Sequence, residues 1–182
     1  TRTNAGLDNI STYKKMFTFE DPGKRIIVIL TAGSLSVTQT VLAKLEEATE
    51  SGPENKHSVF GPSTTLQVAE MIGTLLSEVS VNFQAKLNGM AQSASASLIV
   101  AGQSAGGKQR LFLIYPEGNF IEATSDTPFL QIGEHKYGKP ILDRVIQRNT
   151  TLQDARKAVL LSMDSTLRSN LSVGMPLDLA II

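Results

Sequence analysis

The pattern of apolar and polar positions changes its period along the chain. Residues 26–30 form a continuous apolar run, and residues 18–25 before it contain Asp-Pro-Gly, which together predict a strand, a tight turn and a second strand. Over residues 36–45 and 64–79 apolar residues recur three and four positions apart, which predicts two helices joined by the loop 52–61. The chain is therefore expected to begin with a hairpin followed by a helix pair.

The second part of the chain repeats this order. Short apolar or alternating runs, separated by glycine-rich or Pro-Glu-Gly-Asn turns, are typical of antiparallel strands. The expected strands are residues 94–100, 110–115, 120–123 and, at the end of the chain, 177–182. Between the last two, helical spacing starts at Tyr137 and again at Thr151, whose side chain is suited to capping a helix.

Strands and helix pairs in this order bury the most apolar surface as two stacked sheets between two helical layers. We therefore expect an α+β fold, a four-layer αββα sandwich, forming a single domain over residues 1–182. A length of 182 residues, with 41% hydrophobic and 19% charged residues, fits one domain with a sizeable core.

Composition narrows the functional classes. The 17 basic and 17 acidic residues form no long run of one sign, so no nucleic-acid partner is expected. No apolar run approaches the roughly 20 residues of a membrane span, so we expect no membrane partner and a cytoplasmic location. The absence of cysteine excludes disulfides and a cysteine nucleophile. His57 and His135 lack metal-ligand spacing, and the acidic residues of 46–50 fit a solvated helix face, so no metal and no cofactor is expected.

One motif suggests a serine hydrolase. Residues 102–106, Gly-Gln-Ser-Ala-Gly, match the Gly-x-Ser-x-Gly nucleophile turn, and Asp126 and His135 follow in hydrolase order. That turn needs a helix directly after the serine, whereas an expected strand follows here, which favours a hairpin loop. A phosphate loop is disfavoured as well, because Gln109 stands where a magnesium-binding Ser or Thr is required. A serine hydrolase that uses Ser104 stays a distant alternative.

A lysine pair and a glycine turn carry the clearest chemical signal. Because strand side chains alternate, one of Lys14 and Lys15 is expected to point toward the interior, where a lysine without partners has a lowered pKa. Gly33 lies between the apolar strand and the expected helix, and free backbone N–H groups at such a turn can hold a developing negative charge. No obvious nucleophile lies nearby.

These residues carry a resemblance to a known family. The chain resembles the proteasome-type threonine peptidases at Lys14-Lys15, Thr31-Ala32-Gly33 and the segments 110–118 and 168–174. It is most similar to their bacterial ancestral-β-subunit (Anbu) type at residues 1–6, 132–144 and 162–172. The resemblance covers the whole chain, and the last two segments are specific to that type.

The resemblance implies an N-terminal-nucleophile hydrolase that cleaves peptide bonds of polypeptide substrates and self-associates into a ring or helical homo-oligomer. In such enzymes a threonine hydroxyl attacks the carbonyl, its own α-amine acts as the base, and a lysine ammonium assists. By motif match Lys15 is that lysine, Gly33 offers the oxyanion its N–H, and Ser169 and Ser172 hydrogen-bond near the amine. The implied substrate-binding residues are Thr3, Asn4, Thr31 and Leu35.

Two positions depart from the family pattern. Ser169 stands where proteasome β-subunits generally carry aspartate, and Glu134 stands where they carry serine.

The family's first hairpin, which bears the nucleophilic threonine, is expected upstream of Arg2. Thr1 opens a polar turn rather than a buried strand, so we do not expect it to be the nucleophile. The alternative is a non-catalytic, assembly-forming relative with the same fold.

Overall fold

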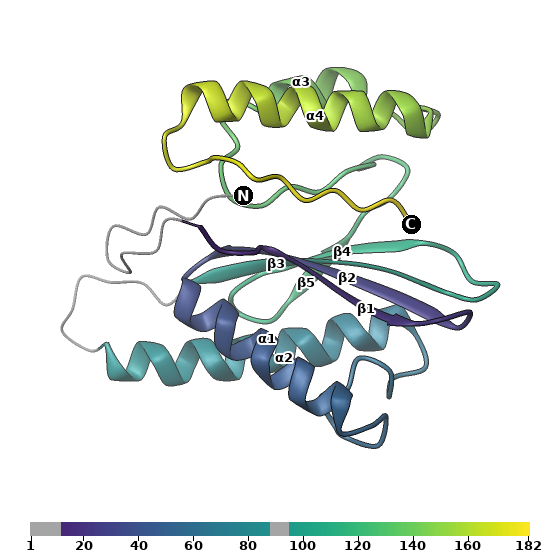
Figure 1. Ribbon diagram of the computed structural model, residues 1–182, viewed down its shortest axis with the longest axis vertical. Helices are drawn as coiled ribbons and strands as arrows, with labels where there is room; N and C mark the ends of the chain where they lie inside the picture. The colour runs from purple at the N-terminus through teal and green to yellow at the C-terminus, as the bar shows by residue number, and fades with distance from the viewer. Residues whose placement is uncertain (1–11, 88–94) are drawn as a thin grey trace.

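The computed structural model describes residues 12–87 and 95–182, which form an antiparallel sheet with helices on both sides (Figure 1). The strands are β1 (Met16–Asp21), β2 (Arg25–Gly33), β3 (Ala96–Ser104), β4 (Arg110–Ile114) and β5 (Phe120–Glu122). Their order in the five-stranded sheet is their order in the chain, and every neighbouring pair is antiparallel. The predicted hairpin and the predicted sequential strands are therefore confirmed.

The helices are α1 (Leu35–Glu50), α2 (Thr65–Lys86), α3 (Lys139–Val145) and α4 (Leu152–Ser169). Local signals in the sequence account for where two of them begin. Thr64 accepts a hydrogen bond from the backbone N–H of Gln67, whose side chain returns one to the backbone of Thr64, a complete capping box. Thr151 likewise accepts from the backbone N–H of Asp154. Both predicted helix pairs are confirmed.

The hydrophobic core lies between α1–α2 and one face of the sheet. Residues at every second position of β2 and β3 point into it, and the two helices each contribute a stripe at helical spacing. Fully buried side chains in this core include Ile27, Ile29, Val41, Leu45, Leu75, Leu76, Leu98 and Phe112. Burial of each side chain of this size contributes roughly 1.5–3 kcal/mol, so this layer supplies most of the apolar stabilisation.

The opposite face of the sheet is apolar as well. Val28, Ile99 and Leu113 point to it and are buried. On this side the chain after β5 and the segment after α4 run between the sheet and the helix pair α3–α4, which forms the outermost layer (Figure 1). A sheet buried on both faces is what the sandwich prediction requires.

The predicted final strand at 177–182 is wrong. Residues 174–182 run without regular structure and make no backbone hydrogen bond to another described residue, and without such bonds no strand forms. The α+β class and both outer helix pairs are confirmed, while the described residues contain one of the two expected sheets.

Candidate active site

Lys15 lies directly before β1 with its side chain half-buried, whereas Lys14 is exposed and rests over the ring of Phe17. Burial lowers the pKa of the Lys15 ammonium, since removal from water disfavours the charged form. Within residues 12–87 and 95–182, no side chain or backbone group forms a hydrogen bond or ion pair with this ammonium. The prediction from strand alternation is confirmed, because the side chain of one lysine of the pair is half-buried and that of the other is exposed.

The backbone fixes Lys15 beside the end of β2. The N–H of Thr31 donates to the carbonyl oxygen of Lys15 at 3.0 Å, one step beyond the pairing of Met16 with Leu30. The lysine therefore lies alongside the strand that leads to Gly33, although the two residues are far apart in the sequence.

Gly33 ends β2 in a conformation that other residues rarely adopt. Its φ is +104°, and a Cβ at this position would lie 2.5 Å from the carbonyl oxygen of Ser95 on the neighbouring chain segment. That oxygen instead accepts the N–H of Ser34 at 2.8 Å. The glycine is exposed, so its backbone is accessible to a ligand at the start of α1.

Thr31 and Leu35, which the family resemblance places in the substrate site, flank Gly33 but are both buried. Thr31 points to the core face of the sheet, and Leu35 is the first residue of α1. Their proposed contact with substrate stays a prediction. Thr3 and Asn4 lie outside the described residues.

The two serines lie at the end of α4 and just beyond it. Ser169 is the last residue of that helix, and Ser172 follows in a turn in which its N–H donates to the side-chain oxygen of Asn170 at 2.8 Å. Both serines are exposed, and Asn170 lies between them.

Asn170 also binds a carboxylate from a distant loop. Its side-chain amide donates to Glu134 at 2.7 Å, and the backbone N–H of Lys136 donates to the other carboxylate oxygen at 2.7 Å. The Lys136 N–H and, to a smaller extent, the Asn170 amide hold the pKa of Glu134 below its usual range. No short-range pattern predicts this pair, because its members are 36 positions apart.

The Glu134 loop connects the serines to the glycine turn. Gly133, with φ of +81°, lies against Ala32, so that a Cβ there would be in van der Waals contact at 3.7 Å from the Cβ of Ala32. Ala32 precedes Gly33. The structure thus brings the end of β2, the Glu134 loop and the end of α4 into one region, which provides a cation, exposed backbone and a fixed carboxylate.

A family model described as proteasome subunit matches residues 24–182. The chain belongs to the proteasome family. Anbu (ancestral beta-subunit) from Yersinia bercovieri superposes with a TM-score of 0.87 at 44% identity, covering 97% of this chain and 72% of that one. The helical assembly of the Anbu complex from Pseudomonas aeruginosa gives 0.88 at 45%, covering 97% and 71%. Anbu from Hyphomicrobium sp. strain MC1 gives 0.81 at 47%, covering 97% and 72%.

These relatives confirm both the proteasome-type fold and the Anbu type predicted from the sequence. Among curated proteins none matches this chain.

In this proteasome-family chain the serine-hydrolase motif is a hairpin. Ser104 is the last residue of β3, and its hydroxyl accepts a hydrogen bond from Arg25 at 3.1 Å. A turn leads from it into β4 rather than into a helix, as predicted. His135 is exposed, and no group of three His, Asp or Glu in the part of the chain that the structure describes is arranged to hold a metal.

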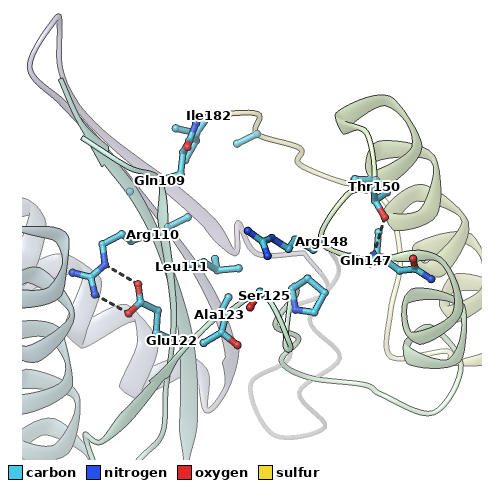
Figure 2. A pocket seen from close by; sticks show the side chains of 17 residues that line it. Gln109, Arg110, Leu111, Glu122, Ala123, Ser125, Gln147, Arg148, Thr150 and Ile182 are labelled. Atoms are coloured by element: carbon cyan, nitrogen blue, oxygen red, sulfur yellow. Dashed lines mark hydrogen bonds and ion pairs between the residues drawn. The ribbon is translucent and has the colours of Figure 1, made fainter. Parts of the chain in front are cut away.

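A pocket of the described proteasome-like structure lies elsewhere, between the sheet and the α3–α4 pair (Figure 2). Its volume is about 560 Å³, and it contains none of the predicted site residues. On its wall Arg110 and Glu122 form a bidentate ion pair, in which both N···O distances are 2.7 Å. Arg148 extends between the strands and the helix pair.

None of the helices in the described residues has the length and apolar character of a membrane span.

Proposed function

We propose that this chain is a subunit of a self-compartmentalising, proteasome-like threonine peptidase of the bacterial cytoplasm, which hydrolyses peptide bonds in polypeptides. The observation that carries the proposal is the position of Lys15. Its ammonium is half-buried, and its backbone carbonyl accepts a hydrogen bond from Thr31 in the strand that ends at Gly33. Membership of the proteasome family supports the reaction class. The proposed nucleophile is a threonine that precedes Thr1 in the complete protein.

In the proposed mechanism, the threonine hydroxyl attacks the carbonyl carbon of the scissile peptide while its proton passes to the threonine's own α-amine. The Lys15 ammonium stabilises the developing negative charge on the attacking oxygen. The backbone N–H of Gly33 donates to the oxyanion of the tetrahedral intermediate. The C–N bond then breaks as the amine returns the proton to the leaving nitrogen, and water hydrolyses the remaining ester.

The other residues have supporting roles in this proposal. Ser169 and Ser172 hydrogen-bond near the α-amine and orient it, and their position depends on the Asn170–Glu134 contact. Thr3 and Asn4 line the groove in which an extended substrate pairs with protein backbone, and Thr31 with Leu35 lines the first side-chain pocket.

The lysine pair provides a matched test. In protein whose intact mass shows the upstream threonine to be present, we expect Lys15→Met to lower cleavage of a fluorogenic peptide by about 10²–10⁴-fold. Lys14→Met, one residue away and exposed, should keep the wild-type rate. Full activity of Lys15→Met would overturn the proposal.

The second candidate is a non-catalytic, assembly-forming subunit. It is favoured by Ser169, which replaces the family's aspartate and is exposed at the end of α4. Protein that carries the upstream threonine and assembles, yet cleaves none of a broad peptide library, would support this candidate over the first.

A further inference from the structure

The carboxylate of Glu134 is fixed by contacts within its own loop and from the end of α4. One oxygen accepts the backbone N–H of Lys136 and the other accepts the side-chain amide of Asn170, both at 2.7 Å. The side-chain amide of Gln131 donates to the backbone carbonyl of Glu134 at 2.7 Å, which holds the loop itself. Ordering a glutamate side chain in this way costs rotamer entropy, so the fold keeps this charge in one place against that cost.

Asn170 joins this carboxylate to the two serines that the family resemblance sets near the nucleophile's α-amine. Its side-chain nitrogen donates to Glu134, and its side-chain oxygen accepts the N–H of Ser172 at 2.8 Å. Asn170 also directly follows Ser169 in the chain. The carboxylate of Glu134 is therefore one side chain away from the turn that carries both serines.

The Glu134 carboxylate is not the partner of Lys15. Burial lowers the pKa of that ammonium, whereas an adjacent anion would raise it. Both residues belong to the described part of the chain, and they form no ion pair with each other. The Glu134 loop instead approaches the glycine turn through Gly133, which lies against Ala32. The region therefore offers a cation and an anion at two separate places.

Proton transfer in the proposed mechanism creates a positive charge on the α-amine, and a nearby anion favours that charge. Ser169 and Ser172 supply hydrogen bonds but no charge, whereas Glu134 is ionised at neutral pH, because the Lys136 N–H, the Asn170 amide and the Lys136 ammonium lower its pKa. Glu134 is partly exposed. An ionised carboxylate has about four acceptor positions, so it can accept from a further donor beside the two named here.

We propose that Glu134 binds the α-amine of the nucleophilic threonine, by accepting a hydrogen bond from it and balancing the positive charge that it acquires. Asn170 sets the position of the carboxylate. The two departures from the family pattern then compensate each other, because the carboxylate missing at position 169 is supplied from position 134. The inference rests on the proposed function, since it assigns a role within that active site.

The first test neutralises the carboxylate but keeps its shape. Glu134→Gln retains an oxygen that can accept from Asn170. In protein whose intact mass shows the upstream threonine, kcat for a fluorogenic peptide should fall by about three- to tenfold with little change in KM. The acid limb of the kcat/KM profile should move to lower pH by about one unit, because the amine loses its anion.

Glu117→Gln is the matched control for this substitution. Glu117 is exposed in the turn between β4 and β5, which contacts α2 through Gly118, and its neutralisation should leave both the rate and the pH profile as in wild type. Thermal melting shows whether each variant is folded. A wild-type pH profile in folded Glu134→Gln contradicts the inference.

The second test moves the carboxylate to position 169. Adding Ser169→Asp to Glu134→Gln should restore most of the lost rate and return the acid limb toward higher pH, because the new carboxylate lies next to Asn170. Gln153→Asp adds the same charge to the other end of α4, about 24 Å along the helix axis, and should restore nothing. Equal recovery with either addition would mean that the effect of Glu134 is not local.

The third test needs no turnover. NMR titration of the upstream threonine, labelled with ¹³C, reports the pKa of its α-amine, which Glu134→Gln should lower relative to wild type. An unchanged amine pKa overturns the inference even in a fully active enzyme. A lowered amine pKa in a chain that cleaves no peptide would support the contact with Glu134 and count against the proposed function alone.

Discussion

The helix pairs α1–α2 and α3–α4 have the same apolar period in the sequence but differ in what lies beneath them. The first pair packs directly on the sheet and buries a continuous stripe from Leu35 to Val79. The second pair buries only Leu142 and Ala158 among its hydrophobic side chains. Helical periodicity therefore predicts that a helix forms and has an apolar face, but not which surface that face meets.

The difference follows from what each pair covers. α1 and α2 lie on a sheet whose five strands are all joined within the described chain. α3 and α4 lie over chain that has no ladder hydrogen bonds, such as residues 174–182. The apolar residues Val28, Ile99 and Leu113 face this same side, so the second layer has the composition of a core although its packing is looser.

The largest expected difference between the two helix pairs is in the free energy of unfolding that a truncated side chain costs. Leu75→Ala in α2 removes a fully buried side chain, and we expect a loss of about 2–5 kcal/mol in the free energy of unfolding. Val159→Ala in α4, where the side chain is 39% exposed, should cost less than about 1 kcal/mol. Urea unfolding of the two variants measures the contrast. Equal losses would show that α4 is as tightly packed as α2.

Gly73 gives a second, smaller contrast within α2. A Cβ at this position would collide with the carbonyl oxygen of Gly118 in the turn between β4 and β5. Alanine improves helix propensity by about 1 kcal/mol, but we expect overpacking of about 1–3 kcal/mol to dominate, so that Gly73→Ala is destabilising.

The neighbouring substitution Thr74→Ala serves as the control for Gly73→Ala. Thr74 is exposed, and Thr74→Ala should leave the midpoint of thermal unfolding nearly unchanged. A Gly73→Ala variant more stable than wild type would mean that α2 does not contact that turn.

The helix caps distinguish the pairs by cooperativity. Thr64→Ala and Thr151→Ala each remove a capping hydrogen bond worth about 1 kcal/mol. Because α2 is part of the core, the first substitution should lower global stability. The second should increase hydrogen exchange mainly in the first turn of α4. Exchange that rises throughout the chain in Thr151→Ala would show that the two layers unfold together.

Features encoded within a few residues could be predicted from the sequence. The helix cap at Thr151, the hairpin turn and the inward side chain of the lysine pair all depend on neighbours in the chain. The strand predicted at 177–182 failed because apolar residues permit a strand, but only a hydrogen-bonding neighbour makes one. For the candidate site too, features that depend on neighbouring residues were predicted, and contacts between distant residues were not.

Within that site, strand alternation predicted that one lysine of the pair turns inward, and the turn that ends an apolar run indicated Gly33. Only the family resemblance singled out Lys15 within the pair. The contact of Asn170 with Glu134 could not be predicted, because only the folded chain brings the end of α4 to a loop 36 residues earlier. Thr3 and Asn4 depended wholly on the family resemblance and stay predictions.

The smallest expected effect concerns the hydrogen bond from Asn170 to Glu134, which links the end of α4 to the loop beside the glycine turn. Hydrogen bonds from the Lys136 backbone and from Asn170 lower the folded-state pKa of Glu134. A carboxyl with a depressed pKa stabilises the fold at neutral pH, and this contribution is lost as the pH falls from the unfolded value of about 4.3 through the folded one.

Asn170→Ala should therefore raise the pKa of Glu134 toward its unfolded value, as measured by NMR titration of the side-chain carboxyl. Glu122 is the control, since its pKa is lowered by Arg110, in the sheet, and should not change. If Glu134 titrates as in wild type, the neighbouring backbone N–H groups, chiefly that of Lys136, hold its pKa down without Asn170. Packing, rather than the hydrogen bond from Asn170 to Glu134, would then hold the end of α4 beside the glycine turn. The α3–α4 layer, the more loosely packed of the two, would then lack a polar connection to the candidate site.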